Sequence, residues 1–241
     1  RFFSAMAAER GDGVFFAGDL GQRIFQQPFS WKSLGLDVRG RSFTLRINYR
    51  TSHQIRLHAD RLLPAIVSDV DGNTESRRGT VSMFDGPTPI VTACADTEHE
   101  SQVVGKWIKD RLQDGCVPSE LGGFVRSDAE LKRARAAVKS AGARSIELTD
   151  KVEVEIGAVA ISTMHYAKGL EFRSVIVMAC DEDVIPNEQR IEAVSDDADL
   201  EEVYNTERQL LYVACTRARD HLLITGVEPV SEFVDDFVKG Q

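Results

Sequence analysis

Four short segments carry side chains of the kinds that bind phosphates and nucleobases. Their sequences are GDLGQRIF at 18–25, LRINYRTS at 45–52, ISTMHYAKGLEF at 161–172 and ERQLLYVACTRA at 207–218. An arginine is always charged and offers planar donors that match a phosphate, and a tyrosine beside it can stack on a base. Tyr49 and Arg50 are adjacent, so together they could hold both ends of a nucleotide. For each segment taken singly, a helix cap or a structural ion pair is the alternative.

The segments lie beside short apolar runs that we predict to be strands. These runs are rich in β-branched and aromatic residues and bounded by Gly, Pro, Asp or Ser. They span 14–17, 43–47, 90–93, 124–125, 159–161, 175–178 and 222–224. Apolar residues at helical spacing occupy 52–63, 97–114, 128–141 and 200–219, and Asp96 or Thr97 can cap the second of these helices. Such alternation predicts an α/β fold, with a mostly parallel sheet and helices on both faces.

The position of the polar residues along the chain favours nucleotide binding. In open α/β sheets the ligand lies beyond the carboxyl ends of the strands. Asp19, Gln22, Tyr49, Arg50 and the stretch 163–171 all come directly after predicted strands. We therefore expect these residues to share one edge of the sheet.

Composition and charge exclude several other classes of protein. The chain has 241 residues, with 29 Lys and Arg against 38 Asp and Glu, and a net charge of −9. An acidic chain does not coat DNA by charge alone, so any nucleic-acid contact must be local. No apolar run approaches the length of about 18 residues that marks a membrane span, and we expect no membrane partner. Four scattered cysteines predict reduced, buried thiols in a cytoplasmic protein, with no metal site.

Three further stretches have simple interpretations. Residues 71–80 are polar and rich in turn formers, which predicts a mobile loop. The acids of 196–202 suit a solvated loop that leads into a helix N-terminus. The basic residues between 126 and 144 have helical spacing, and we expect an exposed face with only a minor prospect of nucleic-acid contact. They are Arg126, Lys132, Arg133, Arg135, Lys139 and Arg144.

In this order the four segments resemble the third to sixth motifs of the UvrD/Rep group of superfamily 1 DNA helicases. YVACTRA and KGLEF are the specific matches, and between the motifs only spacing and pattern agree. The family has two RecA-like domains that close on ATP while single-stranded DNA crosses their top. The resemblance implies that 1–40 is a remnant of the first RecA-like domain, with the third motif and a linker. Residues 41–241 would then be the second RecA-like domain, with the other three motifs and no large insertion subdomain.

The resemblance also implies roles for individual residues. Gln22 would sense the γ-phosphate, Arg50 would contact it, and Arg217 would act as an arginine finger. Tyr49 would stack on adenine, and Glu171 would bind the ribose. The other implied ATP contacts are Asp19 and Gly169.

Contacts to DNA are implied for three residues, which are Thr163, His165 and Phe25. Glu207, Tyr212 and Thr216 lie within the sixth motif, but helix packing and local pairing explain them better because most residues inside a helix serve structure.

The implied activity is that of an ATP-dependent DNA helicase in DNA repair, which translocates 3′–5′ on single-stranded DNA and unwinds duplex. Its cofactors would be ATP and Mg²⁺, bound mainly by an N-terminal ATPase domain of the same chain. The 241 residues contain no GxxxxGK[ST] phosphate cradle, and they begin without Met. We therefore expect a piece of a longer protein that is inactive alone. The alternatives are a RecA-like interaction or regulatory module without motor activity, and a helicase subunit of a RecB-like nuclease complex.

Overall fold

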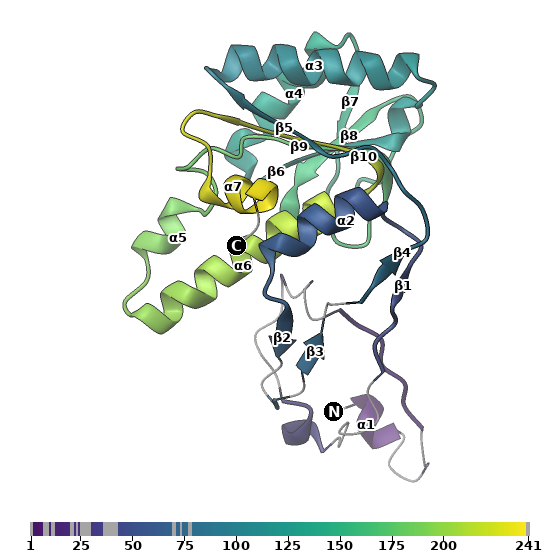
Figure 1. Ribbon diagram of the computed structural model, residues 1–241, viewed down its shortest axis with the longest axis vertical. Coiled ribbons are helices and arrows are strands. Elements are labelled where there is room, and N and C mark those ends of the chain that lie inside the picture. Colours follow the sequence, from purple (N-terminus) through teal and green to yellow (C-terminus); the bar gives the residue numbers. More distant parts are fainter. Residues whose placement is uncertain are drawn as a thin grey trace.

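The computed structural model describes residues 2–6, 10, 13–19, 22, 24, 30–35, 43–68, 71–72, 74–76 and 79–239. Phe25 lies outside these residues. Figure 1 shows a layered α/β body with a narrower extension below it that carries the N-terminal part of the chain. The elements of the body are β5 (Ile90–Cys94), α3 (Thr97–Gln113), β6 (Leu121–Val125), α4 (Leu131–Ser140), β7 (Ser145–Glu147), β8 (Val159–Thr163), β9 (Phe172–Val177), α5 (Glu188–Glu192), α6 (Asp197–Cys215), β10 (Ala218–Val227) and α7 (Glu232–Lys239).

The centre of the body is a six-stranded sheet in the order β5-β10-β9-β6-β8-β7. Every neighbouring pair is parallel, and Leu223 of β10 is in register with Ile90 on one side and Ile176 on the other. The predicted α/β class is therefore confirmed. A parallel sheet needs cover on both faces, because each face carries apolar side chains.

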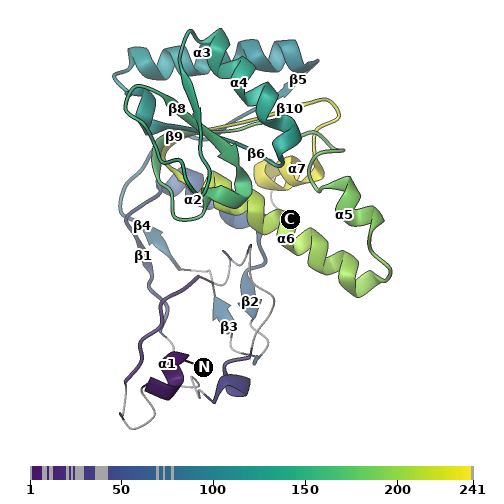
Figure 2. The same ribbon diagram turned by 180° about the vertical axis from the view of Figure 1, so that it is seen from behind.

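Helices supply this cover on both sides. Ile176 and Leu223 pack into the cluster beneath α3 and α4. Val175, Val177 and Ile224 alternate with them and pack into the second cluster, on the side of α6 and α7. The helix α2 (His53–Ala59) joins this second layer, and Figure 2 shows the two layers from behind. Successive side chains of a strand point to opposite faces of the sheet, so each strand contributes residues to both hydrophobic clusters.

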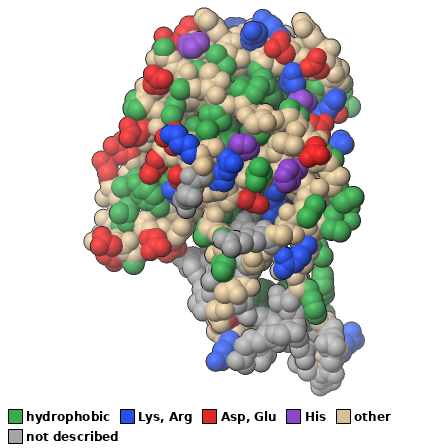
Figure 3. All heavy atoms as spheres, in the orientation of Figure 1, with side chains coloured by type: hydrophobic (Ala, Val, Ile, Leu, Met, Phe, Trp, Pro, Cys, Tyr) green, Lys and Arg blue, Asp and Glu red, His purple; other side chains and the backbone are tan. Residues whose placement is uncertain are grey.

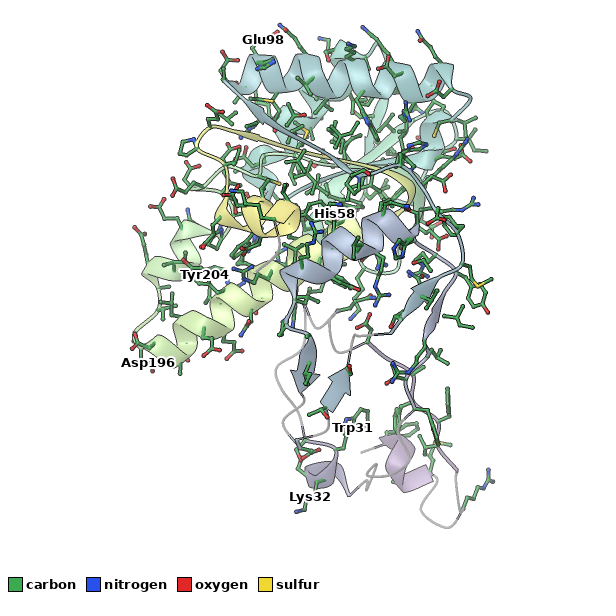
Figure 4. All side chains as sticks on the ribbon, in the orientation of Figure 1. Trp31, Lys32, His58, Glu98, Asp196 and Tyr204 are labelled. Carbon is green, nitrogen blue, oxygen red and sulfur yellow. The ribbon has the colours of Figure 1, made fainter. Side chains whose placement is uncertain are left out.

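Most predicted elements of the body are present. The helix predicted at 97–114 is α3, and the carboxylate of Asp96 caps it by accepting from the backbone N–H of His99 at 2.7 Å. The helix predicted at 200–219 ends earlier, at Cys215. Asp196 caps α6 in the same way as Asp96 caps α3, so the acidic stretch does lead into a helix N-terminus. This acidic tip lies at the far end of the projecting α5 and α6 (Figures 3 and 4).

The N-terminal extension departs from the prediction. Residues 14–17 are not a strand: they have no ladder partner among the described residues, and Phe15 is 90% exposed. The strand predicted at 43–47 shrinks to β1 (Ile47–Asn48), which pairs in parallel with β4 (Val81–Ser82). The loop predicted at 71–80 contains β3 (Thr74–Ser76), paired antiparallel with β2 (Ile66–Ser68). An apolar run becomes a strand only where a neighbour completes its hydrogen bonds. The short helix α1 (Phe2–Met6) also belongs to this extension.

The basic stretch 126–144 is an exposed face only in part, because Lys132, Arg135, Lys139 and Arg144 are exposed, whereas Arg126 is buried and Arg133 is half-buried. Arg126 is buried after β6 and binds Glu207 of α6 through two bonds of 2.5 and 2.6 Å. Arg133 binds Glu100 at 2.6 Å and Asp181 at 2.6 Å. The other two pairs are Arg135–Glu147 and Arg144–Glu155. The partners of Arg126 and Arg133 come from distant segments, and those of Arg135 and Arg144 lie 12 and 11 positions further along the chain. Helical spacing alone therefore did not reveal these partners.

The four cysteines are free and buried, as predicted. None of the helices in the described part of the chain is long and apolar enough to cross a membrane.

Candidate nucleotide-binding site

The predicted nucleotide residues meet where β9 and β10 begin. Phe172 and Ala218 are paired in the ladder, and the residues before them, Glu171 and Arg217, are therefore neighbours. The backbone N–H of Phe172 donates to the carbonyl of Arg217 at 3.0 Å. Arg50 reaches this point from the turn after β1, with its Nε 2.8 Å from Oε2 of Glu171.

This is the amino edge of the sheet, and the prediction of a site at the carboxyl edge is wrong for these residues. Thr163 ends β8 at the carboxyl edge, but the chain then returns to the start of β9 within 164–171. Thr163 is the last residue of β8, and Glu171 directly precedes the first residue of β9. The sequence places both residues at strand ends, but it does not show at which edge of the sheet the ligand binds.

The turn that carries Arg50 is fixed by its neighbours. The side-chain oxygen of Asn48 accepts from the backbone N–H groups of Arg50 at 2.9 Å and Thr51 at 3.4 Å. This is the local bonding by which Asn stabilises turns. The hydroxyl of Thr51 donates to the carbonyl of Thr216 at 3.2 Å, which docks the turn beside Arg217. Tyr49 lies in the same turn with 70% of its surface exposed, as a stacking platform requires.

Arg217 lies below this surface and is only 1% exposed. Its Nε donates to the carbonyl of Val213 at 3.0 Å, and its two Nη atoms donate to the carbonyl of Leu170 and to Oγ1 of Thr216, both at 3.3 Å. Val213 is in the last turn of α6, where a cation is favoured by the helix dipole. All three bonds go to uncharged oxygens, so they satisfy N–H donors of Arg217 without placing a negative charge beside its guanidinium.

No salt bridge joins Arg217 to a carboxylate within the described ranges. Asp220, three positions after Arg217, binds Arg173 at 3.2 Å. Burial and, after it, the nearby charge of Arg50 lower the pKa of Arg217 to about 10, while Tyr212, Asp19 and Glu171 act in the opposite direction. Arg217 is thus a buried cation without a salt bridge. Burying such a charge costs folding free energy, which favours a role for Arg217 other than stabilising the fold.

The segment around Gln22 lies against the same site. The side-chain amide of Gln22 donates to Oδ2 of Asp19 at 2.8 Å, and Nζ of Lys168 donates to the Gln22 carbonyl at 2.9 Å. Ile24 anchors the segment in the core on the α6 side of the sheet. Lys168 was absent from our predicted contacts, although its place directly before Gly169 in the KGLEF match was a signal.

Gly169 has a backbone role. Its φ of +90° lies in the region that side-chain-bearing residues rarely adopt, and this turn directs the chain toward β9. A Cβ at Gly169 would meet no atom within 4 Å, so conformation and not space favours glycine there.

Thr163 and His165, two of the three residues predicted to contact DNA, lie at the other edge of the sheet. Thr163 lines a pocket of about 340 Å³ at the carboxyl ends of β6, β7 and β8. Tyr166, which our prediction omitted, lines the same pocket and is partly exposed. His165 follows Thr163 at this edge, and burial lowers its pKa, with the charge of Arg126 adding to the effect. The full lining is Asp128, Leu131, Arg135, Glu147, Leu148, Thr149, Ser162, Thr163 and Tyr166.

The structural roles that we predicted within α6 and after it are confirmed. Glu207 is fully buried and, besides Arg126, accepts from Arg190 at 2.9 Å. The hydroxyl of Thr216 donates to the carbonyl of Tyr212 at 2.9 Å.

The described residues do not form a magnesium site. No group of three or more His, Cys, Asp or Glu side chains among them is placed to hold a metal ion, and the carboxylate of Glu171 is bound by Arg50. We therefore derive no chemical step through Mg²⁺ from this chain.

Comparisons with known proteins agree with the motifs. Residues 142–228 match the model of the UvrD-like helicase C-terminal domain. The ATP-dependent DNA helicase PcrA of Staphylococcus epidermidis is 42% identical over 77 residues, which is 32% of this chain and 10% of that helicase. PcrA of Staphylococcus aureus strain Mu50 is 42% identical over 76 residues, with the same coverage of both chains. The matched stretch is thus about a tenth of the length of these relatives.

A crystal structure shares the fold. The C-terminal domain of a possible DNA helicase from Lactobacillus plantarum WCFS1 superimposes with a TM-score of 0.54 at 21% sequence identity. The match covers 80% of this chain and 94% of that one. Together these findings confirm the resemblance to UvrD-type helicases.

Proposed function

We propose that this chain is the second motor domain of an ATP-dependent DNA helicase of the UvrD/Rep type. In this proposal, residues 41–241 form that domain, and the residues before them connect it to a first RecA-like domain. The observation that carries the proposal is the meeting of Arg50, Glu171 and Arg217, from three separate motifs, at one edge of the sheet. Arg50, Arg217 and Lys168 at this site outnumber the carboxylates of Glu171 and Asp19, so the site has excess positive charge.

Such a site suits phosphoryl transfer. In the transition state, charge spreads over the γ-phosphate oxygens, and a positioned arginine stabilises it. Arg50 would contact the γ-phosphate from the surface, and Arg217 would contribute from beneath once Leu170 and its neighbours allow the approach. Gln22 would sense the same phosphate, and Tyr49 would stack on the adenine. Glu171, Asp19 and Gly169 complete the proposed ATP contacts.

The phosphate cradle and the Mg²⁺ belong, in this proposal, to the first RecA-like domain. The present chain then binds ATP weakly and does not hydrolyse it alone, because the cradle and its lysine supply much of the binding. Coupling to 3′–5′ translocation, duplex unwinding, DNA repair and a cytoplasmic location are further parts of the proposal.

The opposite edge of the sheet would contact DNA. Thr163 and His165 are the proposed contacts at this edge, and the pocket beside Thr163 adds the ring of Tyr166. Phe25, which lies outside the described residues, remains a proposed DNA contact from the motif resemblance alone. Single-stranded nucleic acid is commonly held by stacking its bases on aromatic side chains. The proposal thus assigns ATP and DNA to opposite edges of one sheet.

The test uses a protein that joins this chain to a first RecA-like domain. Arg50→Ala should abolish DNA-stimulated ATP hydrolysis. The matched control is Arg144→Ala, because Arg144 also has one carboxylate partner, Glu155, at 2.7 Å and is similarly exposed. The control should hydrolyse ATP normally. Normal hydrolysis by Arg50→Ala, or no ATPase activity in the unaltered protein, would favour an interaction module over a motor.

A further inference from the structure

Two of the proposed nucleotide contacts bind each other. The Nε of Arg50 is 2.8 Å from Oε2 of Glu171, although the two residues are 121 positions apart in the sequence. Their side chains are 45% and 46% exposed, so solvent and ligands can reach both. A phosphate oxygen that takes the Nε of Arg50 must displace this carboxylate.

Both partners are presented by ordered backbone. Arg50 follows the Asn48 turn, and the chain on either side of Glu171 is held by two bonds: Nη1 of Arg217 donates to the carbonyl of Leu170, and the Phe172 N–H donates to the carbonyl of Arg217. Because the backbone is fixed, opening the pair requires only that the two side chains rotate.

The charges around the pair favour such an opening. Arg217 lies beneath with no carboxylate partner among the described residues, and it is close enough to Arg50 for their charges to repel. Glu171 is the carboxylate that binds Arg50, and it acts with Asp19 on the charge of Arg217 without a salt bridge to it. A terminal phosphate group carries more charge and more acceptor oxygens than a carboxylate, so it matches two guanidinium groups better.

We infer that the Arg50–Glu171 ion pair is an exchange site that selects nucleotides over free polyphosphates. A phosphate takes Arg50, and the released carboxylate of Glu171 accepts hydrogen bonds from the vicinal hydroxyls of a ribose. A nucleotide thus gives each side chain of the opened pair a new partner, the phosphate for Arg50 and the ribose for Glu171. A polyphosphate without a sugar leaves Glu171 unpaired and next to its own negative charge. This inference rests on the proposed nucleotide site.

An ordinary surface ion pair in the same chain provides the comparison. Arg144 and Glu155 are 2.7 Å apart with exposed fractions of 57% and 50%, but they belong to one local stretch of the chain. The pKa of Glu155 is lowered by Arg144 alone, so no second cation contributes there. Glu155→Gln is therefore a matched control for Glu171→Gln, with the same change of charge.

The experiment follows the Arg50 Nε–H signal of the 241-residue chain by ¹H–¹⁵N NMR during titration with inorganic tripolyphosphate, ATP and 2′,3′-dideoxy-ATP. Weak binding suits this method because shifts report millimolar affinities. Glu171→Gln should bind tripolyphosphate roughly fivefold more tightly, the factor that corresponds to an exposed ion pair of about 1 kcal/mol. It should also lose the preference for ATP over tripolyphosphate. Unaltered protein should prefer ATP to dideoxy-ATP, and Glu155→Gln should behave as the unaltered protein does.

The outcomes separate this inference from the proposed function. If ATP shifts the Arg50 signal but Glu171→Gln binds tripolyphosphate no more tightly, the exchange is wrong and the nucleotide site stands. If neither ATP nor tripolyphosphate shifts that signal in either protein, the nucleotide site itself is wrong, and the exchange with it.

Discussion

Replacing Arg217 by methionine should remove function at little cost in stability. Methionine has a similar length and no charge. Three donated hydrogen bonds are lost. The carbonyl of Val213 remains 3.2 Å from Oγ1 of Thr216, but this hydroxyl has one proton, which it shares with the carbonyl of Tyr212 at 2.9 Å. The carbonyl of Leu170 loses the donor that the structure shows for it. An unsatisfied buried carbonyl costs about 1–3 kcal/mol.

The lost charge offsets this cost. Burial is the main reason that the pKa of Arg217 falls to about 10. Because the pKa is lower in the folded than in the unfolded state, the charged guanidinium destabilises the fold at every pH below about 10. A lowering of about 2.5 in pKa corresponds to roughly 3 kcal/mol. The two effects nearly cancel, and we expect a change in unfolding free energy below about 2 kcal/mol.

Arg126→Met is the matched comparison, because Arg126 is also buried but is paired with a carboxylate. Its loss leaves the fully buried Glu207 with Arg190 as the remaining cation, and we expect a cost of about 3 kcal/mol. Urea unfolding of both variants measures the difference. In a protein with both RecA-like domains, Arg217→Met should also abolish DNA-stimulated ATP hydrolysis. If Arg217→Met is as destabilising as Arg126→Met, Arg217 is a structural cation and our reasoning is refuted.

Three further predictions follow from the structure. Gly169→Ala should destabilise the fold by about 1–2 kcal/mol and weaken ATP binding, whereas Gly157→Ala, with a similar positive φ of +82°, should affect stability only. Equal ATP binding by both variants would contradict a role for the Gly169 turn. Burial and Arg61 lower the pKa of His58, so the unfolded state takes up more protons as pH falls through 6.5 and stability is lost. The Tm of His58→Gln should therefore fall less between pH 7.5 and 5.5 than the Tm of the unaltered protein. An equal fall in both proteins would show that His58 does not cause the loss of stability. Tyr166→Ala should lower the affinity of a two-domain protein for single-stranded DNA about tenfold by fluorescence anisotropy, and full affinity would exclude stacking in the pocket.

The core strands could be predicted from the sequence because both faces of the sheet are covered. Residues 159–161, 175–178 and 222–224 are continuously apolar, and apart from Met178, which follows β9, they lie within inner strands of the sheet. The cap of α3 could also be predicted, because Asp96 needs only its own neighbours to act.

Features that depend on distant partners could not be predicted in the same way. The run 14–17 has the composition of a strand, but composition does not say whether a neighbouring strand exists. The burial of Arg217 depends on Leu170, and that of Arg126 on Glu207, which is 81 positions away. Motif resemblance selected Arg50, Glu171 and Arg217, which meet in the structure, while their pairing and their edge of the sheet came only from the structure.

The neutralised basic stretch has a consequence for ionic strength. A protein releases counterions from single-stranded nucleic acid in proportion to the phosphates that its free cations neutralise, with a slope of about −0.7 per phosphate in log affinity against log salt. Arg126, Arg133, Arg135 and Arg144 already bind carboxylates within the chain, so they release none without breaking those pairs. Nucleic-acid contacts made through these four arginines should therefore resist added salt, whereas contacts made through the exposed Lys132 and Lys139 should weaken.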